Sequence, residues 1–182
     1  MSAAPSGIEA YRLGREYTVM PIPIIAEHCV EIPAGPVLFV VEARSLTVDA
    51  IVENEQAQTA TDGLDHDYDV DAGGASLHVL GAEDRVEYLR FDAFDHEPHY
   101  HYIFNDTQGN VVVRFDDIAE GDPLAWTIRV VGTRLPEMLE HAHGADLAEA
   151  VRSSRDEVAV GVEHLESVLR DAEAAAAALR SA

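Results

Sequence analysis

The chain has 182 residues and a formal net charge of −22, from 34 acidic and 12 basic residues, and 47% of its residues are apolar. This composition fits one domain with a hydrophobic core, and the charge opposes binding to nucleic acids and to anionic membrane surfaces. No apolar run approaches the roughly 20 residues that span a bilayer, and the N-terminus lacks a secretory signal pattern, so we expect a cytoplasmic protein.

Short runs rich in β-branched and aromatic residues predict strands through the first part of the chain. These runs cover 29–32, 37–44, 46–52, 75–80, 85–92, 99–104 and 111–115. The last four runs form two hairpins, because turn-forming residues separate the members of each pair. A stretch poor in apolar residues, 53–74, predicts a long acidic loop. We therefore predict an α+β protein in which residues 1–120 form an antiparallel β-sandwich or open barrel.

Helices are predicted for the remainder of the chain, 121–182. Asp122 and Pro123 are typical of a helix start, and we expect the helix that follows to be kinked or divided at Pro136. A second long helix is predicted over 147–180, where apolar residues recur at steps of three and four. Such a helix would be about 50 Å long, more than a small β domain can cover, so we expect a coiled-coil seam that joins chains into a homo-oligomer. Packing against the preceding helix of the same chain is the alternative.

The densest group of metal-ligating residue types is the segment Asp-His-Glu-Pro-His-Tyr-His-Tyr. In a strand, His99 and His101 would project from one face and the neighbouring tyrosines from the other. His78 or Asp92, from the preceding hairpin, would complete a three-histidine or a two-histidine-one-carboxylate set, and His96 is a further candidate. Such sets bind zinc, iron, nickel or copper. The alternative is that these side chains hydrogen-bond across strands and pack with the helices.

The His-x-His pair resembles the first motif of cupin barrels, in which a carboxylate follows the second histidine. Asp106 stands five residues after His101, while the glycine expected upstream of His99 is absent and no second histidine motif follows. The resemblance is confined to this segment, and it implies a β-barrel with a metal-dependent activity.

Two other features of the sequence give weaker indications of a functional site. Four aspartates at alternate positions of 65–71 offer oxygen ligands for calcium, but the glycine and glutamate of an EF-hand are not matched, which favours a solvated loop. Cys29 follows His28 in a predicted strand, where neighbouring residues point to opposite faces. We therefore expect an inert thiol rather than a nucleophile.

Three functions remain open from these observations. The first is a non-catalytic accessory or scaffold protein with a metal-binding histidine face and a helical oligomerisation tail. The second is a metal-dependent enzyme in which the same residues hold an ion that activates water or dioxygen. The third is an acidic decoy that binds basic proteins in place of a phosphate backbone. We expect the first, with a second copy of the chain or another protein as partner.

Overall fold

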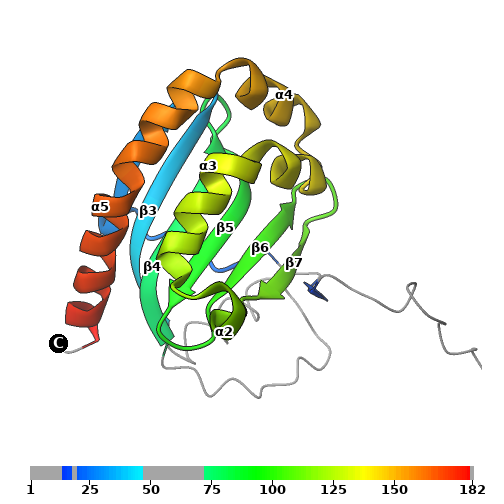
Figure 1. The fold of residues 1–182 in the computed structure, drawn as a ribbon. Coiled ribbons are helices and arrows are strands. Elements are labelled where there is room, and N and C mark those ends of the chain that lie inside the picture. Colours follow the sequence, from blue (N-terminus) through cyan, green and yellow to red (C-terminus); the bar gives the residue numbers. More distant parts are fainter. Residues whose placement is uncertain (1–13, 18–19, 47–71, 181–182) are drawn as a thin grey trace, which may run out of the picture.

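The strands in the described part of the chain form one open antiparallel sheet. The computed structural model describes residues 14–17, 20–46 and 72–180. The strands are β1 (Arg15–Tyr17), β2 (Cys29–Ala34), β3 (Val37–Leu46), β4 (Ala72–Gly81), β5 (Glu87–Phe94), β6 (His99–Phe104) and β7 (Gly109–Arg114). Their order across the sheet is β1-β7-β6-β5-β4-β3-β2, so β2 to β7 form a six-stranded meander and β1 is added beside β7 (Figure 1).

Both predicted hairpins are confirmed, since β4 pairs with β5 and β6 pairs with β7. The loop predicted over 53–74 lies outside the described residues except for 72–74, which belong to β4. The strand predicted over 46–52 also lies outside them, apart from its first residue. Neither a sandwich nor a closed barrel is found in the described part of the chain, because its strands form one sheet whose edges, β1 and β2, do not pair. Helices take the place of a second sheet.

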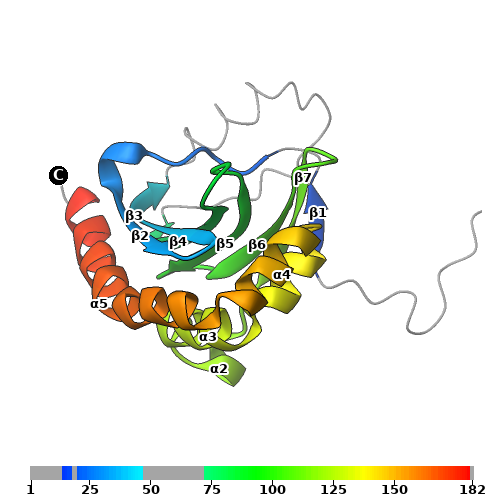
Figure 2. The ribbon, with the colours of Figure 1, turned by 90° about the horizontal axis from the view of Figure 1, so that it is seen from above.

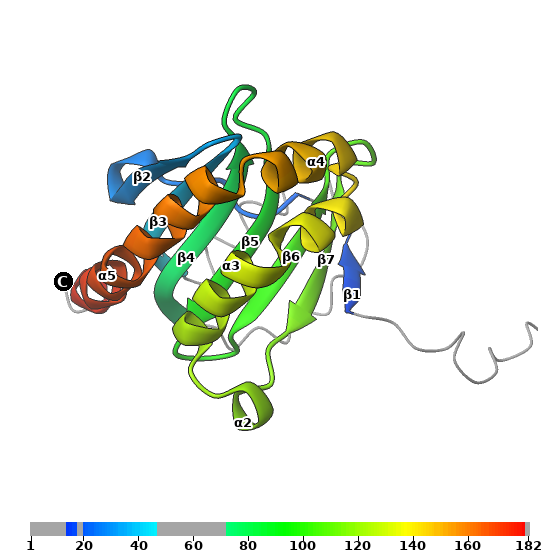
Figure 3. The same cartoon turned by 45° about the horizontal axis from the view of Figure 1, so that its top comes forward.

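Four helices follow the sheet in the chain, and α3 and α5 lie across one of its faces (Figures 2 and 3). They are α2 (Asp117–Glu120), α3 (Pro123–His141), α4 (Ala145–Ser153) and α5 (Arg155–Leu179), and a short 3-10 helix, η2 (Ala26–His28), precedes β2. The predicted helix start is confirmed, since Asp122 Oδ1 accepts a hydrogen bond from Ala125 N at 2.9 Å. Pro136 lies inside α3 and does not divide it. Burial of the neighbouring Leu135 and Met138 offsets the hydrogen bond that proline cannot donate.

The helix predicted over 147–180 is divided into two helices that meet at Ser154. Ser154 has φ −115° and ψ 33°, outside the helical region, and α5 packs on β2, β3 and β4 of the same chain. The buried residues of α5 are Val158, Gly161, Leu165, Leu169, Ala172 and Ala176. Most of the α5 positions predicted to form a coiled-coil seam therefore find their partner within the chain, and self-association stays a prediction.

One hydrophobic core lies between the helices and the sheet. Alternate strand residues point into it, among them Phe39, Leu77 and Phe91, each at most 1% exposed. Tyr100 lies beside Phe91 on this side, with ring centroids 6.0 Å apart, as the alternation in β6 predicts. Leu165 is among the helix residues that close the core, so the β-rich and helical regions share it. None of the helices in the described residues is long and apolar enough to cross a membrane.

The opposite face of the sheet is crossed by the segment before η2 and β2. Residues 20–25, called the strap below, run over this face (Figure 2). The strap contributes Ile24 to a small apolar cluster formed by Leu38, Val40 and Leu80. Beyond this cluster, the face is lined by charged and polar side chains, which form the candidate site.

Candidate metal centre

The face of the sheet opposite the helices carries buried and half-buried polar side chains, and is called the polar face below. They are Glu42 and Arg44 of β3, Ser76 and His78 of β4, Glu87, Arg90 and Asp92 of β5, His99 and His101 of β6, and Asn110 of β7. Successive side chains along a strand point to opposite faces, which places these residues on one face, and the strand register aligns them in rows across the sheet. Ser76, Asp92 and His99 share one row. His78, Arg90 and His101 share the next.

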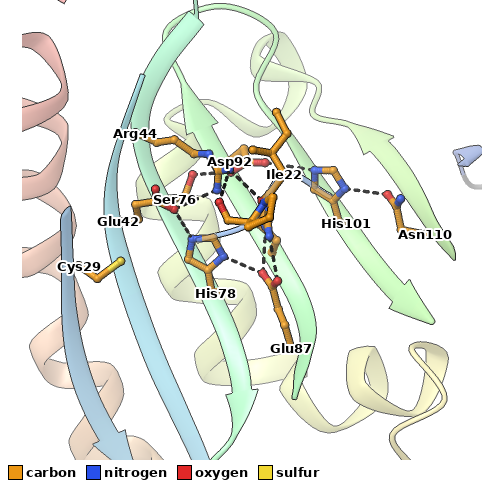
Figure 4. A network of polar contacts seen from close by, with 12 residues as sticks. Ile22, Cys29, Glu42, Arg44, Ser76, His78, Glu87, Asp92, His101 and Asn110 are labelled. Carbon is orange, nitrogen blue, oxygen red and sulfur yellow. Dashed lines mark hydrogen bonds and ion pairs between the residues drawn. The ribbon is translucent and has the colours of Figure 1, made fainter. Parts of the chain in front are cut away.

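Asp92, His99 and His101 form a group that could hold a metal ion; Figure 4 shows Asp92 and His101. The ligand atoms of the three residues all lie within 4.8 Å of one another. Asp92 Oδ2 is 3.3 Å from His99 Nε2 and 3.1 Å from His101 Nε2. Two ligands at about 2.0 Å from a tetrahedral zinc ion lie about 3.3 Å apart, so these two separations suit an ion bound by Asp92 and the histidines. Ser76 Oγ donates to Asp92 Oδ1 and leaves Oδ2 to face the histidines.

A second contact fixes the orientation of each histidine. His99 Nδ1 lies 2.8 Å from the backbone oxygen of Glu97, which can only accept a hydrogen bond. His101 Nδ1 lies 2.9 Å from Asn110 Oδ1. If an ion took the place of the hydrogen between each Nε2 and Asp92, each Nδ1 would keep its hydrogen and donate it to this second oxygen, and each Nε2 lone pair would face the ion. This is the tautomer that a metal-binding histidine needs, with its other nitrogen held by an oxygen.

The electrostatics of the group follow from burial and from the shared carboxylate. Burial alone would raise the pKa of Asp92, but hydrogen bonds from His101 and His99 outweigh it and hold this pKa well below its usual range. Burial alone would lower the pKa of His99, but the hydrogen bond to Asp92 and its charge reverse the effect, so this pKa is raised. Burial lowers the pKa of His101, and the contact with Asp92 offsets it only in part. The carboxylate is therefore ionised at neutral pH, and a cation beside it, a proton or a metal ion, is favoured.

The other half of the polar face is a cluster of ion pairs. His78 lies between two carboxylates, with Nδ1 2.7 Å from Glu87 Oε1 and Nε2 3.1 Å from Glu42 Oε2. Arg44 Nη1 donates to Glu42 Oε2 at 2.9 Å. Arg90 donates to both oxygens of Glu87, at 2.9 and 2.8 Å. These contacts compensate charges whose burial alone would be strongly unfavourable, and they occupy both ring nitrogens of His78.

The five predicted metal ligands do not all meet. The structure brings together Asp92, His99 and His101, which is the two-histidine-one-carboxylate alternative. His78 stands one row away and is held by two glutamates, so it does not join them. His96 is exposed in the connection between β5 and β6, where no strand pairing holds it beside the others.

The carboxylate beside the histidines is not the one that the cupin resemblance implies. Asp106 is exposed and lies 3.0 Å from His143 Nδ1, and the sheet is open. The carboxylate comes from Asp92, which precedes the histidines in the chain and pairs with His99 across β5 and β6. The strand register, rather than a short sequence motif, assembles the group.

Sequence reasoning missed the residues around the group. Ser76 and Asn110 contact it, and Glu42, Arg44 and Glu87 belong to the ion-pair cluster beside it. For Glu42 and Arg44 a signal exists, because two charges at alternate positions of an otherwise apolar strand indicate a buried polar face. No local signal marks Ser76 or Asn110, because their partners lie on other strands.

The two weaker features of the sequence contribute little to this site. The aspartates of 65–71 lie outside the described residues. Burial, with a smaller contribution from the charge of Glu42, raises the pKa of the Cys29 thiol to about 11. The thiol donates to Ile25 O at 3.2 Å. This environment fits an inert thiol.

The fold and the site define an α+β protein with a two-histidine-one-carboxylate group on the sheet face opposite its helices. The chain belongs to a family described as a domain of unknown function (DUF7700), whose model matches residues 31–172. The match begins within β2 and includes every residue of the polar face, whereas the strap precedes it. Comparisons with curated proteins and with solved structures found no match.

Proposed function

We propose that this protein is a metal-binding accessory protein that holds a divalent transition metal ion through Asp92, His99 and His101. The observation that supports this most directly is the convergence of two histidine Nε2 atoms on one carboxylate oxygen, at 3.1 and 3.3 Å. Each Nδ1 is already engaged by another oxygen, which leaves Nε2 for the ion. Two neutral imidazoles and a carboxylate suit zinc, iron, nickel or copper.

The strap supports a non-catalytic role. It crosses the polar face, and its carbonyl oxygens accept hydrogen bonds from Arg44 and Arg90, so both guanidiniums are engaged by the chain itself. A structural zinc site has four protein ligands, whereas this group offers three. An ion held by three ligands beside this segment suits storage or transfer to a partner.

The same ligand number favours a second candidate, a metal-dependent enzyme. Catalytic zinc sites have three protein ligands and a fourth position for water, and non-haem iron oxygenases use two histidines and one carboxylate. In this case Asp92, His99 and His101 would hold an ion that activates water or dioxygen.

Metal analysis of the full chain, purified without a histidine tag, tests the proposal. We expect one ion per chain, and saturable binding when Zn²⁺ is titrated calorimetrically into the metal-free protein. His99→Gln and His101→Gln each remove a ligand, so each should weaken Zn²⁺ affinity beyond the roughly tenfold to hundredfold loss typical of an outer-shell change. Circular dichroism of each variant checks that the fold is retained.

His96→Gln is the matched control, because it makes the same change at an exposed histidine of the same segment. It should leave Zn²⁺ affinity unchanged. Wild-type affinity in folded His99→Gln or His101→Gln would overturn the proposal. The visible spectrum of the Co²⁺-substituted protein separates the two candidates, since a shift on adding azide would reveal an exchangeable position and favour the enzyme.

A further inference from the structure

The carbonyl oxygen of Ile22, in the strap, accepts a hydrogen bond from each of two buried guanidiniums (Figure 4). Arg44 Nη2 donates to it at 2.9 Å, and Arg90 Nη1 donates to it at 2.7 Å. The two arginine side chains are 2% and 4% exposed. A negatively charged oxygen at this position would add the attraction between opposite charges to the two hydrogen bonds, which a neutral peptide carbonyl cannot supply. An anion would therefore suit this position better than a peptide carbonyl does.

The charge balance of the polar face also favours a negatively charged group between the two arginines. Its three carboxylates, Glu42, Glu87 and Asp92, outnumber its two guanidiniums by one. A divalent ion on Asp92 adds two positive charges, so the positive charges of the face then exceed its carboxylates by one. The region is largely buried, and uncompensated charge there is strongly unfavourable.

The guanidiniums and the metal group are neighbours on the sheet. Arg90 pairs with His101 across β5 and β6, and it lies on the same face of β5 as Asp92. A small anion held by the arginines would therefore compensate the charge of the ion. We infer that the metal-loaded protein binds a small oxyanion, whose oxygen replaces the Ile22 carbonyl oxygen between Arg44 and Arg90. This inference rests on the proposed metal site and adds a ligand to it.

The strap is built as an occupant that an anion can displace. Residues 20–25 belong to no strand or helix, so no ladder of backbone hydrogen bonds holds them. Apart from the two arginines, their contacts with the polar side of the sheet include Ile24 on the small apolar cluster and Ile25 N, which donates to Glu42 Oε1 at 3.2 Å. The Ile25 side chain is 42% exposed. Release of the strap therefore uncovers little of the hydrophobic core.

Calorimetric titration of Zn²⁺ into the metal-free full chain tests the inference. The titration is run in sodium chloride, sodium acetate and sodium sulfate at equal ionic strength. If an anion and Zn²⁺ favour each other's binding, each raises the affinity for the other by the same factor. Such couplings are typically about fivefold or more. We expect at least about a fivefold gain in acetate or sulfate over chloride. Acetate tests a planar carboxylate, and sulfate tests a tetrahedral oxyanion. Complexation of Zn²⁺ by either anion in solution would lower the apparent Zn²⁺ affinity rather than raise it.

A variant with a more flexible strap tests whether the strap and the anion compete for the arginines. Pro21→Ala combined with Pro23→Ala gives the detached strap more conformational freedom, so the strap competes less well with the anion. We expect the ratio of the Zn²⁺ affinity in acetate or sulfate to that in chloride to be roughly fourfold larger in this variant. Pro33→Ala is the matched control, because Pro33 is exposed in β2 and lies outside the strap. It should reproduce the wild-type gain.

Each outcome decides one part of the inference. Equal Zn²⁺ affinity in the three salts would overturn anion binding and leave the metal site standing. If the folded strap variant shows the same increase in Zn²⁺ affinity in acetate or sulfate as the wild type, the strap and the anion do not compete. Absence of Zn²⁺ binding in every salt would overturn the proposed function, and this inference with it.

Discussion

The packing of α5 on the sheet predicts opposite effects for one substitution at two helical glycines. A Cβ atom at Gly161 would overlap Ala34 Cβ and lie 3.3 Å from both Ala34 Cα and Phe39 Cε2. Ala34 is 1% exposed in β2, and its Cβ cannot rotate away. Among the described residues, a Cβ atom at Gly132 of α3 would meet only Val162 Cγ1, at 3.4 Å, which is an ordinary contact.

Alanine is favoured over glycine inside a helix by about 0.5–1 kcal/mol. Gly132→Ala should therefore raise the free energy of unfolding by about that amount. Gly161→Ala gains the same helix preference, but overpacking against the sheet costs about 1–3 kcal/mol, so we expect the free energy of unfolding to fall by up to about 2.5 kcal/mol. Urea unfolding followed by circular dichroism measures both variants against the wild type. Equal stabilisation by the two substitutions would refute this docking of α5 and would favour a helix whose partner is another chain.

Further predictions concern the core, the ion pairs and the thiol. Leu165→Ala should lower the free energy of unfolding by about 3–5 kcal/mol because Leu165 is 0% exposed, whereas Val160→Ala, at 56% exposed, should change it by less than about 0.5 kcal/mol. Any oligomer formed through α5 would use its outward side, so Val160→Asp should lower the mass seen by light scattering; an oligomer that persists unchanged would exclude that interface. Glu87→Gln leaves buried Arg90 without its partner and should cost about 3 kcal/mol at pH 7. Burial alone would raise the pKa of Glu87, but the charge and hydrogen bonds of Arg90 and the His78 contact hold it below its usual value. The carboxylate therefore stabilises the fold above the unfolded-state pKa of about 4.3, and this contribution is lost as the pH falls through the lower folded-state pKa. Acid unfolding should show the gap between Glu87→Gln and the wild type narrowing below about pH 4, and a constant gap would contradict the assignment. Cys29, with a pKa of about 11, should react with iodoacetamide at pH 8 at least about a hundredfold more slowly than free cysteine, and reaction at the free rate would contradict its burial.

Features that depend on a few consecutive residues are predictable from this sequence. The two hairpins, the helix cap at Asp122 and the placement of His99 and His101 on one strand face are all confirmed. Each follows from backbone geometry over one strand or one helical turn. Helix continuity is different, because packing competes with local preference. The helix α3 continues through Pro136, where its neighbours are buried. The helix predicted over 147–180 is instead interrupted at Ser154, where α5 begins its path along the sheet.

By itself, the sequence determines which side chains share a face of each strand and which side of the last helix is apolar. Only the tertiary structure decides that Asp92, and not His78 or His96, stands beside the histidine pair. The register of β4, β5 and β6 makes that choice, and it is set by the turns and by the apolar core on the other face of the sheet rather than by the ligands. The partner of α5 is decided in the same way, since an apolar stripe packs on whichever apolar surface the fold leaves uncovered, and here that surface is the helix side of β2, β3 and β4.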